Sequence, residues 1–216
     1  MENILENLMH LTDPNWIMQH GGLYIVIIIV FIETGFPFGF FLPGDSLLFI
    51  AGMVIANTLS PMSLPVINLI YWIVLIAVAG TLGNFAGYWI GRKSETLLFR
   101  QKDRFFFKKK YLLQAKAFYD KKGGSAIMLA RFLPIVRTFA PIVAGMVKMP
   151  PGKFAVYNIA GSFLWVISIV SAGFLLGENK WVQENLEIII IGIVCITMAP
   201  VLIKMFTRKK NKMVIQ

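Results

Sequence analysis

The sequence predicts an all-α integral membrane protein, and its composition and one long uncharged run carry the prediction. Of the 216 residues, 57% are hydrophobic and only 15% are charged, whereas soluble domains carry about 25% charged residues. The run from Ser46 to Gly91 contains no Asp, Glu, Lys or Arg. Because a helix needs about 20 apolar residues to cross the hydrocarbon core, this run is long enough to span a membrane.

The net charge of +10 suggests nucleic-acid binding at first sight, but its distribution argues against that function. Eleven of the 21 basic residues lie in 92–122, and five more lie between Lys204 and Lys212. Both clusters flank apolar runs, where the positive-inside rule places basic residues in the cytoplasm. Membrane topology and anionic lipid headgroups explain the charge, so we expect lipids and not nucleic acid as partners.

The chain divides into three parts. Residues 1–20 are predicted to form an amphipathic segment along the membrane interface, residues 21–207 the transmembrane domain, and residues 208–216 a basic cytoplasmic tail. Within the domain we expect a re-entrant hairpin at 22–57, a transmembrane helix at 66–91, a cytoplasmic basic segment at 92–122, a second re-entrant hairpin at 123–150, and transmembrane helices at 154–177 and 186–206.

The basic clusters determine the direction of each crossing. With 92–122 and the tail in the cytoplasm, and two crossings after residue 154, the region 123–150 must begin and end on the cytoplasmic side. By the same reasoning 22–57 begins and ends outside. The predicted fold is therefore an inverted-topology repeat of two opposed re-entrant helical hairpins, each followed by a transmembrane helix, plus a C-terminal transmembrane helix. Such repeats place their binding site near the midplane.

Both predicted hairpins are broken by prolines and carry charges at membrane depth. Proline lacks a backbone donor and interrupts helices, and we expect breaks at Pro37, Pro43, Pro134 and Pro141. The first hairpin supplies Glu33 and Asp45, and the second supplies Arg131 and Arg137. Charged groups persist within a membrane only when protein encloses them or they face water, so we expect the hairpin tips to meet.

The four charges predict a site for an anionic group. Guanidinium groups stay protonated and bind phosphate in a bidentate fashion, which makes Arg131 and Arg137 the candidate headgroup-binding residues. Glu33 and Asp45 are the candidate counter-ions and proton-coupling groups, because burial and a nearby arginine act on a carboxyl in opposite directions. The alternative interpretation is that the four residues form salt bridges that only tie the hairpins together.

The helix at 66–91 carries two further features. Asn84 is a polar group in an apolar run, and we expect it to support the site by bonding a neighbouring hairpin. Four glycines form a small-residue seam on one face that lets another helix approach closely: Gly80, Gly83, Gly87 and Gly91. Trp165 is predicted to be an interfacial or packing aromatic.

Catalytic chemistry is not predicted. The sequence has no GxxxxGK[ST] phosphate loop, its only cysteine is Cys195, and its histidines, His10 and His20, lie far from the broken segments. We therefore expect no cofactor, no metal site and no enzymatic activity.

At its charged segments the sequence resembles the DedA family, also called the SNARE-associated or VTT-domain family. The resemblance lies in FIETG at 31–35 with LPGDSLL at 42–48, in ARFLPIVRTFAPIVAG at 130–145, and in GTLGN at 80–84 with GYWIGR at 87–92. It covers about residues 20–177, and the arginine motif is its most specific part.

The resemblance implies a multi-pass protein of the bacterial inner membrane, with opposed re-entrant hairpins, that moves lipids between leaflets. Members are associated with undecaprenyl phosphate recycling, with phosphatidylethanolamine or with the proton motive force. The acidic and arginine pairs essential in the family fall on Glu33, Asp45, Arg131 and Arg137. Asp45 stands where many members have Glu, and Asn84 where many have Asp, so a third titratable group is absent.

The leading hypothesis is a flippase for a phosphate-bearing lipid, with undecaprenyl phosphate as first candidate. The alternatives are a phosphatidylethanolamine or general phospholipid flippase or scramblase, and a proton-coupled exchanger of ions or solutes. Coupling to protons and assembly into a homo-oligomer are left open by the sequence.

Overall fold

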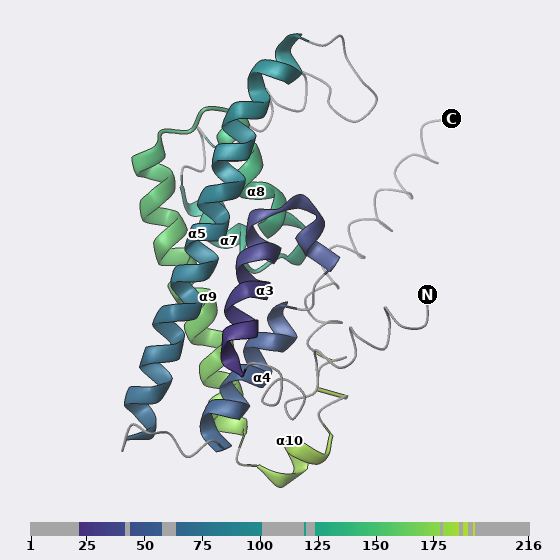
Figure 1. Ribbon diagram of the computed structural model, residues 1–216, viewed down its shortest axis with the longest axis vertical. Coiled ribbons are helices and arrows are strands. Elements are labelled where there is room, and N and C mark those ends of the chain that lie inside the picture. The colour runs from purple at the N-terminus through teal and green to yellow at the C-terminus, as the bar shows by residue number, and fades with distance from the viewer. Residues whose placement is uncertain are drawn as a thin grey trace, which may run out of the picture.

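The structure is a computed structural model of the 216-residue chain, and it describes residues 22–41, 44–57, 64–100, 119, 124–177, 179–185, 188–189 and 192. The all-α class is confirmed for these residues, which form helices and their connecting turns (Figure 1). The elements are α3 (Leu23–Gly35), the 3-10 helix η1 (Pro37–Phe41), α4 (Gly44–Asn57), α5 (Pro65–Arg100), α7 (Ser125–Ala130), α8 (Pro134–Met146), α9 (Pro151–Leu176) and α10 (Lys180–Glu184).

Several predicted segments lie outside the described residues. These are the N-terminal segment 1–20, most of the basic segment after residue 100, nearly all of the C-terminal helix 186–206, and the tail 208–216. Pro43, one of the predicted breaks, also lies outside them.

The helices α5 and α9 form the frame of the molecule. The stretches Pro65–Ser94 and Pro151–Leu176 are each long and apolar enough to cross a membrane, and they correspond to the helices expected at 66–91 and 154–177. They run antiparallel, because Thr81 contacts Ser162 while Asn84 contacts Asn158. The helix α5 continues to Arg100, so the start of the predicted basic segment is helical.

The outer face of α5 is apolar along its length. Its exposed side chains recur at helical spacing: Val66, Ile70, Val74, Val78 and Leu82. An amphipathic helix of a soluble protein would turn a polar stripe outward. The outward apolar stripe is therefore typical of a helix that faces lipid.

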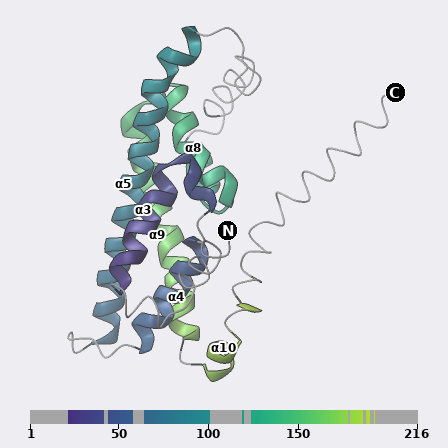
Figure 2. The same ribbon diagram turned by 45° about the vertical axis from the view of Figure 1, so that its right-hand side comes forward.

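The remaining long segments form two helical hairpins that lie against this frame (Figures 1 and 2). In the first hairpin, α3 runs parallel to α5, with Tyr24 against Trp72 and Gly35 against Gly83. Its second arm, α4, runs back along α9. In the second hairpin, α7 follows α9 and α8 returns along α5. The two hairpins thus point toward each other from opposite ends of α5.

Glycines allow α4 to pack closely on α9. A Cβ on Gly52 would meet the carbonyl oxygen of Val170, and a Cβ on Gly173 would meet the carbonyl oxygen of Phe49. Only glycine permits such close approach of two helix backbones.

The same pattern recurs where α8 packs on α5. A Cβ on Gly145 would meet the carbonyl oxygen of Tyr88, and a Cβ on Gly91 would meet that of Ile142. On α9, Gly173 lies three residues after Val170, whose carbonyl oxygen faces Gly52. On α5, Gly91 likewise lies three residues after Tyr88, whose carbonyl oxygen faces Gly145. The hairpin arms α4 and α8 are therefore equivalent in their packing, and the predicted glycine seam on α5 contacts α3 and α8.

The structure corrects one predicted break. Pro141 lies inside α8, which continues from Pro134 to Met146. Pro141 has no backbone N–H, so the Arg137 carbonyl lacks the hydrogen bond that it would accept in a regular helix. The flanking turns keep their helical bonds. Pro37 begins η1 and Pro134 begins α8, as expected of proline at the first position of a helix.

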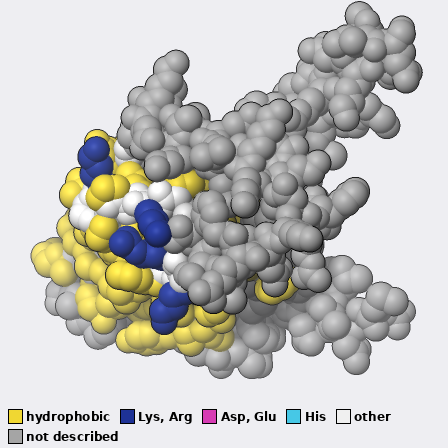
Figure 3. All heavy atoms as spheres, turned by 90° about the horizontal axis from the view of Figure 1, so that it is seen from above, with side chains coloured by type: hydrophobic (Ala, Val, Ile, Leu, Met, Phe, Trp, Pro, Cys, Tyr) yellow, Lys and Arg dark blue, Asp and Glu magenta, His cyan; other side chains and the backbone are white. Residues whose placement is uncertain are grey.

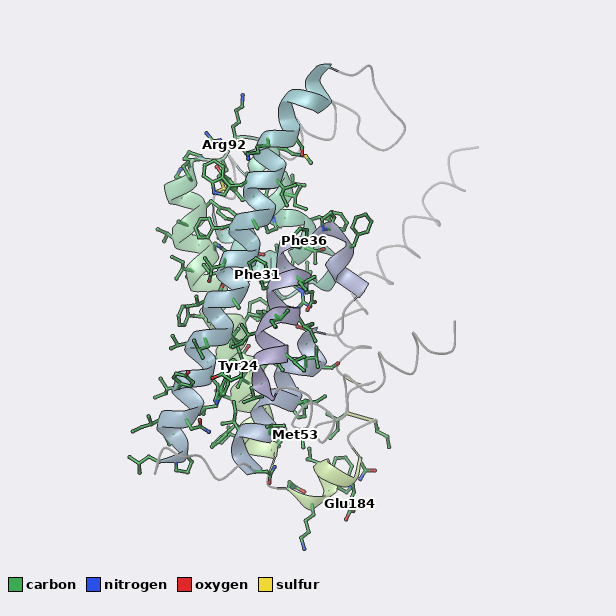
Figure 4. All side chains as sticks on the ribbon, in the orientation of Figure 1. Tyr24, Phe31, Phe36, Met53, Arg92 and Glu184 are labelled. Atoms are coloured by element: carbon green, nitrogen blue, oxygen red, sulfur yellow. The ribbon has the colours of Figure 1, made fainter. Side chains whose placement is uncertain are left out.

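The two ends of the frame differ in charge. Arg92 lies near one end of α5, and Glu184 of α10 lies at the opposite end of the molecule (Figure 4). The end view shows basic side chains and no acidic ones among the side chains that the structure describes (Figure 3). Basic residues at the Arg92 end, where α5 leaves the bundle and α9 begins, include Arg92, Lys93, Lys148 and Lys153.

Candidate functional site

The four predicted charges come from four different elements. Glu33 lies near the end of α3, Asp45 in the first turn of α4, Arg131 directly after α7, and Arg137 in the second turn of α8. Asp45 also benefits from its position, because a carboxylate in the first turn of a helix interacts favourably with the helix dipole.

Arg137 joins the two hairpins. Its Nη2 donates to Glu33 Oε1, and its Nη1 donates to Asp45 Oδ1. The side chains of Arg137 and Glu33 are 6% and 1% exposed, so the ion pair is shielded from the surroundings. One arginine therefore neutralises part of the charge of two carboxylates, which would otherwise repel each other.

Glycines create the room for Glu33. A Cβ on Gly39 would meet the Glu33 backbone, and a Cβ on Gly44 would meet the Glu33 carboxylate. The glycines of the FGF and PGD sequences are thus explained by the close approach of the hairpin turn to this side chain.

Trp165 of α9 is part of the site, and its prediction as an interfacial or packing residue was incomplete. The side chain is fully buried. Its Nε1 donates to Asp45 Oδ1 at 2.9 Å. The guanidinium carbons of Arg137 and Arg131 lie 4.9 and 5.8 Å from its ring centroid, within cation–π range.

Arg131 has a different environment from Arg137. It is 3% exposed, and none of the described carboxylates lies within salt-bridge distance of it. Its Nη2 donates to Asn158 Oδ1 at 2.8 Å and approaches Gly80 O at 3.4 Å. Every described hydrogen-bond acceptor of Arg131 is neutral.

A polar strip between α5 and α9 supports Arg131. Asn158 Nδ2 donates to Thr81 O at 3.1 Å, and Thr81 Oγ1 bonds Ser162 Oγ at 2.8 Å. Asn84 Nδ2 donates to Asn158 Oδ1 at 2.8 Å. When the Asn84 amide is turned, its nitrogen instead donates to Thr34 O at 3.1 Å and its oxygen accepts from Arg131. Only the turned orientation reaches a hairpin, because Thr34 lies on α3 and Asn158 on α9, so the supporting role of Asn84 stays a prediction.

Four buried polar atoms of the site have no hydrogen-bond partner among the described residues. They are Glu33 Oε2, Ser46 Oγ, Arg131 Nε and Arg137 Nε. Buried polar groups are normally paired, and each exception needs an explanation. Two of these atoms belong to the arginines, so the site retains capacity to donate hydrogen bonds to an anion.

Sequence reasoning missed Asn158 and the role of Trp165. Both lie in the long apolar run of α9, where a single polar or aromatic residue looks like any helix-packing residue. The available signal was spacing: Asn158, Ser162 and Trp165 recur three or four residues apart, which places them on one face of a helix.

Among the described residues, no group of three or more His, Cys, Asp or Glu side chains could hold a metal ion. Of the four predicted charged residues, Glu33 and Asp45 both pair with Arg137, while Arg131 shares only the Trp165 ring with this group. Their roles in binding and proton transfer stay predictions.

The chain matches the family model named VTT domain over residues 42–175. It is 41% identical to Protein DedA of Escherichia coli strain K12 over 186 residues, which cover 86% of this chain and 83% of that protein. It is 33% identical over 170 residues to the inner membrane protein YqjA of the same strain, which covers 78% of this chain and 73% of YqjA.

An uncharacterized membrane protein of Mycobacterium tuberculosis strain H37Rv is 37% identical over 203 residues, covering 94% of this chain and 86% of that protein. No solved structure matches the chain. The similarity thus extends over nearly the whole described frame and both hairpins.

Proposed function

Since the chain belongs to the VTT-domain, or DedA, family of membrane proteins, we propose that it moves a phosphate-bearing lipid between the leaflets of the bacterial inner membrane. Undecaprenyl phosphate is the first candidate, because one phosphate group on an apolar tail fits both the buried arginines and the lipid-facing exterior. The relative named as an inner membrane protein supports the location.

One observation carries this proposal: the two buried arginines are unequally paired. Arg137 is held by two carboxylates, whereas Arg131 is held by neutral groups. Salt bridges that only tied the hairpins together would account for Arg137, Glu33 and Asp45. They give no reason to bury a second arginine beside the first, since an uncompensated buried charge is costly.

In the proposed mechanism, the phosphate first binds Arg131 and then competes with the carboxylates for Arg137. Charge-assisted hydrogen bonds from two guanidinium groups hold the phosphate oxygens. The Trp165 ring provides a cation–π contact to both guanidinium groups while their hydrogen-bond partners change. The lipid tail stays outside the protein, in the bilayer.

Proton coupling is a further part of the proposal. Glu33 Oε2 is buried and lacks a partner among the described groups, so this oxygen can accept a proton once phosphate occupies Arg137. Protonation removes the negative charge that would repel the phosphate. The proton then leaves when Arg137 returns to Glu33.

The apolar surface next to the charges supports a lipid substrate over a small solute. The described aromatic side chains Phe36, Phe38, Phe132 and Phe139 follow Glu33, Arg131 and Arg137 closely in the chain and are all exposed. Such side chains suit contact with acyl or polyprenyl tails.

We also propose that both hairpins re-enter the membrane, from opposite sides. Each hairpin is too short to cross twice, because α8 has 13 residues and α4 has 14, against about 20 for a crossing. The equivalent packing of α4 and α8 supports an inverted repeat.

The test is transport in proteoliposomes that contain fluorescent undecaprenyl phosphate in both leaflets. Reconstituted protein should make the inner-leaflet label accessible to an external quencher. Arg131→Ala and Arg137→Ala should each lower the rate at least about tenfold, whereas Lys153→Ala, at the exposed start of α9, should leave it unchanged. Wild-type protein that moves no labelled lipid would refute the proposal. Equal competition by phosphatidylethanolamine would instead indicate a general phospholipid scramblase.

A further inference from the structure

The neutrality of the groups around Arg131 points to a residue that the sequence analysis did not identify. We propose that Asn158 is a positioning residue that fixes the Arg131 guanidinium for a phosphate group while leaving its positive charge uncompensated. The inference rests on the proposed function. It states that a neutral amide, by holding Arg131 without cancelling its charge, makes the site selective for an anion.

The orientation of the Asn158 amide follows from its neighbours. Its Nδ2 donates to Thr81 O at 3.1 Å, and a carbonyl oxygen can only accept. The amide oxygen must therefore point away from Thr81 O, and it accepts from Arg131 Nη2 at 2.8 Å. Asn158 is fully buried, so water does not compete for this bond.

The surroundings of Asn158 keep Arg131 without a counter-ion. Among the described elements around this cluster, α3 contributes Glu33, α4 contributes Asp45 and α8 contributes Arg137, and these three are paired with one another. The facing helix α5 contributes the neutral residues Thr81 and Asn84. The contrast between the two arginines is thus one of charge, since both donate hydrogen bonds to oxygen.

The choice of an amide has a functional consequence. A carboxylate at position 158 would also accept from Arg131, but it would neutralise the charge that attracts phosphate. An amide fixes the guanidinium and leaves its full charge for the substrate. A role in packing alone would make the shape of Asn158 important and its charge irrelevant.

Two substitutions of Asn158 separate the proposed role from a role in packing alone, because the two roles predict opposite orders of phosphate affinity for the variants. Asn158→Asp preserves the shape and the bond to Arg131, loses the bond to Thr81 O, and adds a negative charge. Asn158→Ala removes the bond but keeps the site neutral. Asn68→Asp is the matched control, because Asn68 is a buried asparagine near the start of α5, distant in sequence from the residues of the site.

The experiment measures binding of a fluorescent polyprenyl monophosphate to the full chain in phosphatidylcholine nanodiscs. Inorganic phosphate is the competitor in a second arm, which distinguishes a lipid headgroup from free phosphate as the source of the anion. We expect Asn158→Asp to weaken binding at least about tenfold, Asn158→Ala to weaken it by a smaller factor, and Asn68→Asp to match wild type.

The inference is overturned if Asn158→Ala binds more weakly than Asn158→Asp, or if Asn158→Asp binds like wild type. If Asn158→Asp does not fold, Asn158→Ala is compared with Asn68→Ala, and equal binding by these two variants overturns the inference. Wild-type protein that binds neither phosphate probe would contradict the proposed function itself, whereas wild-type binding with the wrong order contradicts only the role of Asn158.

Discussion

At the residue scale, Arg137 is the link on which both hairpins depend. Replacing it with leucine leaves the buried Glu33 and the half-buried Asp45 without a cation, and removing one partner of a buried ion pair costs about 3–5 kcal/mol. We therefore expect Arg137→Leu to lower the free energy of unfolding by about that amount, measured by chemical denaturation in mixed micelles.

The matched rescue is the triple variant Arg137→Leu with Glu33→Gln and Asp45→Asn, which removes the uncompensated charges. It should recover most of the lost stability. A triple variant as unstable as the single one would show that the ion pairs are not what Arg137 contributes.

Trp165 provides a second test at this scale. Trp165→Phe keeps an aromatic ring beside both arginines and loses the hydrogen bond to Asp45. Hydrogen bonds to charged groups contribute about 1.5–3 kcal/mol, and the free energy of unfolding should fall by roughly that amount. Trp181→Phe is the control, because Trp181 is 62% exposed. Equal effects of the two substitutions would rule out a specific bond to Asp45.

The charged residues of the site and the polar Asn84 could be picked out from the sequence, but Asn158 and Trp165 could not. Glu33, Asp45, Arg131 and Arg137 are conspicuous because charge inside an apolar segment is costly. Asn158 and Trp165 carry no such signal, since neutral residues are tolerated in membrane helices. The unequal pairing of the arginines depends on distances between four elements and is visible only in three dimensions.

At the scale of elements, the two glycine interfaces predict equivalent sensitivity to added volume. In Gly52→Ala and Gly145→Ala the new methyl group would meet a backbone carbonyl of the facing helix. Overpacking of this kind costs about 1–3 kcal/mol, so both variants should unfold at lower denaturant concentration.

Gly152→Ala is the control for these variants, because no atom lies within 4 Å of a Cβ added there. If one interface tolerated alanine and the other did not, α4 and α8 would not be equivalent in packing.

Sequence reasoning located the elements better than it located their ends. Apolar runs identified α5 and α9, but hydropathy falls at Arg92 while the helix continues to Arg100, since basic side chains are compatible with helix. Pro141 was expected to break its hairpin and is instead accommodated within α8. The equivalent packing of α4 and α8 has only a weak counterpart in the sequence, where Ala-Gly occurs at 51–52 and again at 144–145. Two small residues do not by themselves reveal a contact with another helix.

At the scale of the whole molecule, the orientation in the membrane follows from the basic end of the frame. The Lys153 end should face the cytoplasm, and the Glu184 end should face outward. In a background with Cys195→Ser, Glu184→Cys should react with a membrane-impermeant maleimide in intact cells. Lys153→Cys should react only after the membrane is permeabilised. Labelling of both positions in intact cells would contradict the proposed topology.

The central claim is that a lipid phosphate exchanges with carboxylates on the buried arginines. Cryo-electron microscopy of the protein in nanodiscs, with and without undecaprenyl phosphate, tests it most directly. The account predicts phosphate density bonded to Arg131 and Arg137, with Arg137 released from at least one of Glu33 and Asp45. Phosphate bound elsewhere, with Arg137 still paired to both carboxylates and Arg131 still held only by neutral groups, would contradict it.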